Sequence, residues 1–391
     1  MNPSAQGWIK KLRNDIPDND KLFLYSLEDF YDALRACGFI YGSNLHVVAH
    51  RISKQDLTEE ECCKVNLCLS FLHIYHHYKT EIPFVDSVIG FYNAINALKT
   101  SIFDSLLSEK KTSEQLEKII HKRVQIDANV LTKNFNYFIV NALLYIDVLA
   151  YKYYLKHGTV TTDYLKHLEA AIAAISLDVL LSKKEKNAYD ESLIKLFESS
   201  LRYQGEEPLS FGEAVKFIDT PLKKFYILDL ACMASWGDNV IDEKEHHFLK
   251  LLGRSLELPE TRVELSIKMI NAFYKEHKDN IALLSSKNIV QSFYDNSSKM
   301  VVKLITRNSK RLYRELRDSK ELMVLLTQST VRDLNPEEQK KVQEQLLDIF
   351  KSIPSLAIFM LPGGALLLPL VIKFIPKLLP SAFDENRINE E

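Results

Sequence analysis

The sequence predicts an all-α protein, in which multi-helix soluble bundles precede one proline-kinked C-terminal membrane helix or hairpin. Three observations support this class. The 391 residues include only 11 glycines and 12 prolines, below the averages of about 7% and 5%. Outside the C-terminus, these residues separate long apolar runs of helical period. Near the C-terminus, the 18 residues from Ser355 to Ile372 carry no charge, close to the ~20 residues of a bilayer-spanning helix.

The composition places the chain in a reducing compartment. It has five cysteines, an odd number, and their spacing is not that of a disulfide-bonded scaffold. This argues against a disulfide scaffold. The N-terminus has no apolar stretch of signal-peptide type, and Asp15, Asp18 and Asp20 come too early for a mitochondrial presequence. We therefore expect localisation to the cytoplasmic (inner) membrane, with the N-terminal body in the cytosol.

The expected domain boundaries follow changes in composition. We predict an N-terminal helical domain over 1–204, because Gly205 and Pro208 mark the best linker in the chain. A second helical domain should follow at 209–298, and a basic helix with pre-membrane helices at 299–353. The membrane segment is predicted at 354–383, and a short tail at 384–391.

The first helix is amphipathic and basic. Trp8, Ile9, Leu12 and Ile16 share one face, which could lie on a membrane surface or dock on the body; we favour docking. The next helix begins with a cap at Ser26 and ends near Gly38.

A capping box at Thr58-Glu-Glu-Glu61 opens the third helix. It contains His73 and His77, which are four residues apart and are the candidate metal ligands here, beside His76. Cys68 lies off that face and no second ligand pair follows, so we favour buried thiols and hydrogen-bonded histidines over a metal site.

Helices are also expected at 84–107, 113–124, 135–149, 163–181 and 221–235. The helix at 135–149 is apolar nearly all round, but Asp147 and Lys152 interrupt it before it could span a bilayer. It should therefore be a buried core helix, with an extension ending at Gly158. Tyr145-Ile-Asp147 is faintly echoed by Ile227-Leu-Asp229, which hints at a duplicated helical unit.

An acidic turn follows the helix at 221–235. Asp238, Asp242, Glu243 and Glu245, beside His246 and His247, could bind a cation, although they lack the spacing of an EF-hand. Helix capping by Asp242 and Glu245 is the interpretation we favour. Residues 222–258 loosely resemble the tellurite-resistance-protein-B-like helical domain, which has an acidic turn at this place.

A basic stripe is predicted at the start of the third region. Its members are Lys299, Lys303, Arg307, Lys310, Arg314 and Arg317. They advance by three or four residues, which places all six on one face of a continuous helix. Such a face suits phosphates of lipid headgroups or RNA, and a merely solvated face is an equal alternative. No aromatic residues interleave with it, and we predict no DNA partner.

The uncharged C-terminal stretch is rich in proline. Pro354, Pro362, Pro369, Pro376 and Pro380 keep close to one helix face. Gly363 and Gly364 predict a kink or re-entrant turn, and Ile358, Ala365 and Ile372 lose the usual donors to their carbonyls. Lys373 and Lys377 can snorkel and so extend the apolar length. A soluble chain with this hairpin in a groove is the alternative.

These residues also carry a family resemblance. The order Ile353-Pro354, Leu361-Pro362, Leu368-Pro369 and Lys373 to Phe383, after the helix that opens at Leu334-Asn335-Pro336, resembles the transmembrane signature of the LETM family. That family is named after a leucine-zipper and EF-hand protein of the mitochondrial inner membrane. The resemblance covers residues 319–386, and the whole chain is most similar to bacterial LETM-related, biofilm-associated proteins.

The resemblance implies two functional hypotheses, neither of them an enzyme and neither needing a cofactor. One is a membrane-anchored scaffold or adaptor, linked to cation and proton homeostasis, that binds anionic lipid headgroups or the ribosome. The other is a subunit of a homo-oligomeric cation/proton exchanger. Ala365 stands where the family has an acidic residue, which weakens transport. The family's ribosome contact is attributed to a helical domain beyond the membrane segment, which we do not find before Glu391.

Overall fold

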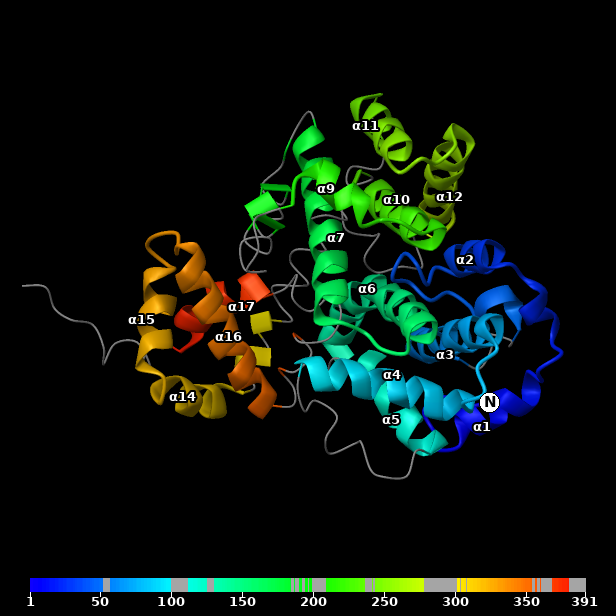
Figure 1. The fold of residues 1–391 in the computed structure, drawn as a ribbon, viewed down its shortest axis with the longest axis horizontal. Coiled ribbons are helices and arrows are strands. Elements are labelled where there is room, and N and C mark those ends of the chain that lie inside the picture. Colours follow the sequence, from blue (N-terminus) through cyan, green and yellow to red (C-terminus); the bar gives the residue numbers. More distant parts are fainter. Residues whose placement is uncertain are drawn as a thin grey trace, which may run out of the picture.

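The computed structural model describes residues 1–51, 57–99, 112–124, 130–183, 209–235, 243–277, 308–353 and 368–379, with short pieces at 186, 190–191, 194–195, 197–198, 241, 301–302, 304–306, 356 and 359. All regular structure in these residues is helical (Figure 1), so the all-α class is confirmed. Of the proposed linker at residues 203–210, residues 203–208 lie outside them.

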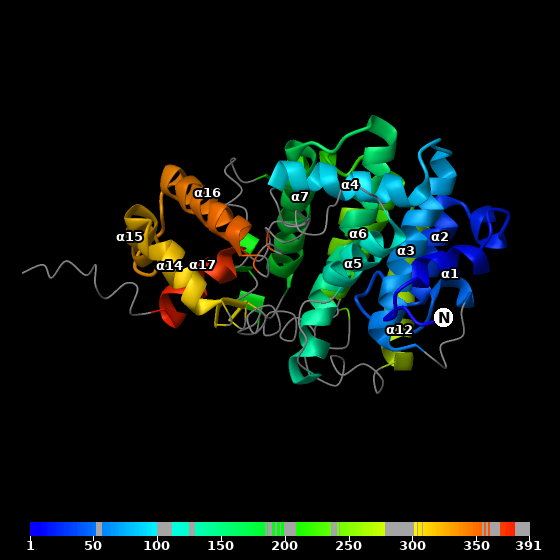
Figure 2. The ribbon, with the colours of Figure 1, turned by 90° about the horizontal axis from the view of Figure 1, so that it is seen from below.

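Helices up to residue 277 form the body of the protein. They are α1 (Trp8–Asp15), α2 (Leu27–Ala36), α3 (Glu59–Tyr78), α4 (Phe84–Lys99), α5 (Ser113–Val124), α6 (Val130–His157), α7 (Thr162–Ser182), α9 (Phe211–Lys216), α10 (Pro221–Ser235), α11 (Glu243–Ser255) and α12 (Glu260–His277), with 3₁₀ turns at Lys21–Leu24 and Val48–His50. The later helices are α14 (Ser309–Arg317), α15 (Lys320–Gln328), α16 (Pro336–Ser352) and α17 (Leu368–Leu378), which group at one end in two perpendicular views (Figures 1 and 2).

The helices begin where the sequence supplies caps. The side chain of Ser26 accepts from the Asp29 N–H, and Thr58 and Glu61 form the expected capping box. Gly158, with a φ of 75°, follows the last residue of α6 and donates its N–H to Tyr154 O at 2.8 Å. Such caps satisfy backbone groups that a helix end leaves without partners.

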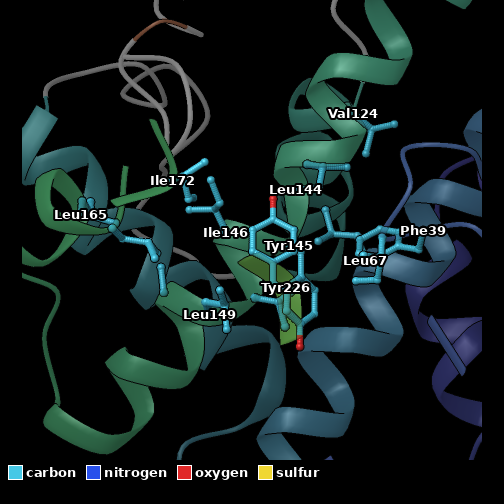
Figure 3. Packing of buried hydrophobic residues seen from close by; sticks show 14 of the residues in the cluster. Phe39, Leu67, Val124, Leu144, Tyr145, Ile146, Leu149, Leu165, Ile172 and Tyr226 are labelled. Atoms are coloured by element: carbon cyan, nitrogen blue, oxygen red, sulfur yellow. The ribbon is translucent and has the colours of Figure 1, made fainter. Parts of the chain in front are cut away.

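The core of the body forms around α6. Its residues from Leu144 to Tyr151 are all buried, including Asp147, whose charge is paired with Arg123. The Tyr145 ring lies 5.2 Å from the ring of Tyr226 on α10 (Figure 3). This helix is therefore the buried core helix that its apolar sequence predicted.

The N-terminal helix docks on the body, as favoured above. Trp8, Ile9 and Leu12 are buried, each contributing about 1.5–3 kcal/mol by burial of apolar surface. The carboxylate of Glu117 on α5 accepts hydrogen bonds from the N–H groups of Gly7 and Ile9, both at 2.9 Å. This carboxylate caps the exposed amino end of α1.

A buried ion pair joins α5 to α6. Arg123 donates from Nε and Nη2 to the two carboxylate oxygens of Asp147, at 2.7 and 2.9 Å. Tyr92 on α4 adds a third hydrogen bond at 3.0 Å. The Asp147 side chain is fully buried, so this bidentate geometry offsets the cost of removing the charge from water.

A second pair of the same kind joins α2 to α10. Asp229 is also fully buried and accepts from Arg35 at 3.2 Å and from the Tyr31 hydroxyl at 2.6 Å. Arg35 donates in addition to Ser266 on α12 at 3.0 Å. The faint echo between the two aspartate sequences thus coincides with a repeated arrangement, a buried aspartate held by one arginine and one tyrosine. These contacts join helices from both sides of the predicted boundary near residue 204.

His73 belongs to the packing of α3 against α2. Its ring stacks on Phe30 at 4.0 Å, and its Nε2 donates to the Tyr25 carbonyl at 3.1 Å. Burial lowers the pKa of His73 to about 4, and the hydrogen bond to Tyr25 only partly opposes this effect. The folded state therefore holds a neutral imidazole.

Among the described residues, no helix combines the length and the apolar character needed to cross a membrane. The longest described helix of the expected membrane segment, α17, has 11 residues, or about 16 Å of axial rise. Its residues Leu368, Leu370, Val371, Ile372 and Ile375 are buried against the other C-terminal helices. The C-terminal membrane helix stays a prediction.

Removal of a buried arginine should strongly destabilise the body. Arg123→Met leaves the carboxylate of Asp147 buried without its cation, and we expect a loss of about 3–5 kcal/mol in the free energy of unfolding, measured by urea titration. Lys224→Met is the control, because its partner Glu257 is 83% exposed and solvent screens that pair. Equal effects of the two substitutions would contradict this account.

The stability of the body should depend on pH through His73. The unfolded state, with an ordinary pKa of 6.5, takes up a proton that the folded state does not accept until about pH 4. The free energy of unfolding should therefore fall as the pH is lowered between these values. His73→Phe keeps the ring against Phe30 and should flatten this part of the profile in urea titrations, relative to wild type and to a His77→Phe control. A wild-type slope in His73→Phe would argue against it.

Candidate functional site

The four helices α14–α17 pack around a shared apolar core, and we call them the C-terminal module. Leu312 and Leu316 of α14, Leu326 of α15 and Val342 and Leu346 of α16 are all fully buried. Phe350 packs on Phe359 with a ring separation of 5.6 Å. The apolar face of α17 completes this core against α15.

A polar network fixes the connection between α15 and α16. Asn335 and Glu338 form a capping box at the start of α16, with Pro336 in its first turn. Arg332 donates to both carboxylate oxygens of Glu338 at 2.7 and 2.8 Å. This hydrogen bond, together with that from the Asn335 backbone, lowers the pKa of Glu338 to about 2. Ser319 Oγ donates to Gln345 at 2.7 Å and ties α15 to α16.

The outer side of α14 is basic. Lys310, Arg314 and Arg317 are exposed at the spacing of one helix face, with Arg311 exposed beside them. Together these four residues form what we call the basic face. Leu312 and Leu316 anchor the opposite side of the same helix in the core, which holds the cations on a rigid element.

The prediction of one continuous helix for this stripe is wrong at Asn308. Asn308 has φ −103° and ψ 10°, and α14 begins after it. The Asn308 side chain donates to the Leu304 carbonyl at 2.7 Å, an amide bond to the backbone that competes with helix continuation. Lys299, Lys303 and Arg307 lie outside the described residues, so the structure places only Lys310, Arg314 and Arg317 of the six.

Within the described residues, the cations of the basic face keep their charge without an acidic partner. None of the four makes an ion pair with the part of the chain that the structure describes. Lys320 was not among the predicted stripe residues. It is exposed at the start of α15 and extends the positive charge. The nearby acid Glu321 is already bound by Lys341 at 2.9 Å and by Gln345 at 3.2 Å. Chemically, this face is suited to bind phosphate groups.

The expected membrane segment is only partly described. Pro369 is the second residue of α17, where a missing N–H costs little, so it does not kink the helix. Pro376 lies inside α17, and Lys373 and Lys377 are exposed. Residues outside the described ranges are Pro354, Pro362, Gly363, Gly364, Ala365 and Pro380.

Those weak metal candidates that the structure describes do not come together. His73 is buried and uses Nε2 for the Tyr25 carbonyl, whereas His77 is exposed. Glu245 is buried, with its carboxylate 4.0 Å from Lys183 Nζ. Asp238 and Asp242 lie outside the described residues. Within those residues, no group of three or more histidines, cysteines or acids could hold a metal.

Comparison with known families gives a match on the part of the C-terminal module that contains α16 and α17, and not on α14 or α15. The model described as LETM1-like, RBD (ribosome-binding domain) matches residues 334–391, which begin just before α16. No curated protein and no solved structure matches the chain. The family's ribosome-contacting part was expected beyond the membrane segment, which ends at Phe383, whereas the match begins at Leu334. The resemblance inferred from the proline spacing is therefore confirmed, and residues 334–391 are a LETM1-like segment.

Proposed function

We propose that the chain is a helical adaptor whose C-terminal module binds the ribosome through the basic face. The observation that carries this proposal is the match of the ribosome-binding-domain model to residues 334–391. These residues include α16 and α17, and α14 packs on α15 and α16. The basic face thus belongs to the same packed unit as the matched segment.

The electrostatics of the module favour a nucleic-acid surface over a chance patch. Arg and Lys side chains bind phosphate oxygens, and Arg does so with two parallel hydrogen bonds. Two buried leucines hold α14 in the module. Its backbone is therefore already ordered before the cations contact a phosphate backbone. The body, with its two buried ion pairs, would supply a rigid platform for a second partner.

Membrane anchoring is the second part of this proposal. The 18 uncharged residues from Ser355 to Ile372 support it, since such a stretch is stable in lipid. The proposed location is the inner membrane with the body on the cytosolic side. The helix α17 is too short to span the hydrocarbon core alone. For anchoring, its apolar face would have to leave the core of the module and enter the lipid.

Cation or proton exchange by an oligomer is the less supported alternative. Ala365 replaces the acidic residue that the resemblance implies, and a carboxylate would be the natural carrier of a proton within the membrane. Cation or proton flux from potassium-loaded vesicles that contain the purified protein would favour this alternative over the adaptor.

Charge reversal on the basic face should abolish ribosome binding. The triple substitution Lys310→Glu, Arg311→Glu and Arg314→Glu should lower the affinity by about tenfold or more in co-sedimentation at moderate salt, because phosphate contacts are replaced by repulsion. A matched triple at the exposed Lys10, Lys11 and Lys21 is the control. A parallel arm with anionic vesicles separates the two phosphate sources. Ribosome binding that survives the reversal, or loss of vesicle binding alone, would refute the proposal.

Anchoring predicts that the full chain stays with membranes after an alkaline wash and needs detergent for release. The charge-reversed triple should stay as well, since apolar burial in lipid and not headgroup attraction would hold it. Release of wild type by alkali, or a monodisperse soluble chain without detergent, would count against the anchor.

A further inference from the structure

The body contains a cavity that the C-terminal module does not share. Its volume is about 300 Å³, and its walls come from the ends of α3 and α6, the first turns of α7, and the connection from α9 to α10. This volume is at the lower end of the range of roughly 300–1,000 Å³ for small-molecule sites. The cavity is therefore of a size for one small ligand and not for a polymer.

Positive charge dominates the wall of this cavity. Four lysines line it, against one acid, Asp219. Lys223 donates to Asp219 at 2.8 Å, which occupies that carboxylate. Lys152, Lys156 and Lys216 make no ion pair within the described ranges. The wall therefore carries an excess of positive charge, which a bound anion would balance.

The lysines of this wall repel one another. Burial lowers the pKa of Lys152, the neighbouring charges of Lys223 and Lys156 lower it further, and the carboxylate of Asp219 only partly opposes these effects. An anion in the cavity would reverse the effect of these like charges. Thr220, which also lines the cavity, directly precedes the 15-residue helix α10, whose amino end adds partial positive charge.

Aromatic rings form another part of the wall, beside Leu149 and Leu168. Tyr153 stacks on Tyr164 with a ring separation of 3.8 Å, and His167 stacks on Phe217 at 4.4 Å. Phe217 is 36% exposed although it is a large apolar side chain. Tyr153 is also stacked on His157 at 4.0 Å, and Lys223 Nζ lies 4.8 Å from the centre of the Tyr164 ring. The exposed part of Phe217 is therefore the surface that this wall offers to a further planar ring.

We propose that this cavity binds a small soluble organic phosphate with a planar ring, of the mononucleotide class. The lysines would hold the phosphate and the aromatic wall would hold the ring. This site goes beyond the ribosome-binding proposal, because it uses none of the residues of the C-terminal module.

The test is isothermal titration calorimetry of the full chain with 5′-AMP, inorganic phosphate and adenosine. AMP should bind more tightly than either part alone. Lys152→Gln and the more exposed Lys156→Gln should each weaken AMP binding by about tenfold or more, as expected for loss of a charged hydrogen bond. Lys118→Gln, which removes an exposed lysine outside the cavity wall, should leave it unchanged.

Phe217→Leu separates recognition of the ring from recognition of the phosphate. It should weaken the binding of AMP and leave that of inorganic phosphate unchanged. The absence of AMP binding, or equal binding in Lys156→Gln and Lys118→Gln, would overturn the proposal. Lysine-dependent binding to phosphatidic acid vesicles without binding of AMP would overturn it as well.

Discussion

Two buried carboxylates hold the body together. Asp147 and Asp229 have no access to solvent, and each accepts hydrogen bonds from one arginine and one tyrosine. A charge in such a place is tolerated only when its partners are complete. The partners come from α2, α4 and α5, so these helices cannot shift relative to α6 and α10 without leaving a buried charge unpaired. The aromatic core and the cationic cavity both depend on this arrangement.

The C-terminal module is constrained differently. Its core is apolar, and its polar contacts lie at the surface, as between Arg332 and Glu338 or Lys341 and Glu321. Exposed pairs of this kind contribute little to stability. The module is therefore held mainly by the apolar faces of its helices, including α17. The same apolar face that would enter a membrane packs against α15, and α15 in turn packs against α14, which carries the basic face.

Much of the fold could be predicted because local signals determined it. Capping residues at Ser26, Thr58 and Asn335 placed three helix starts correctly, and the charges that interrupt the helix around Asp147 identified it as core and not as a membrane span. The partners of the two aspartates could not be predicted, since Arg35 and Asp229 are 194 residues apart. The lysines of the cavity are likewise brought together only by tertiary packing.

The candidate site was predicted in part. Periodicity correctly placed Lys310, Arg314 and Arg317 on one face, because that face is exposed and packing does not override the pattern. It failed at Asn308, where a side chain competes for a backbone carbonyl, and periodicity carries no information about such competition. The family signature was readable because prolines at fixed spacing are a strong constraint on any helix.

The central claim is that cations of α14 neutralise phosphates of the ribosome. The most direct measurement is the dependence of ribosome affinity on salt concentration, for wild type and for Arg314→Gln. Each phosphate neutralised contributes roughly −0.7 to −0.9 to the slope of log affinity against log salt. The account predicts a slope near −3 for wild type, which the substitution reduces in size by about one. A slope that is unchanged in Arg314→Gln would contradict it.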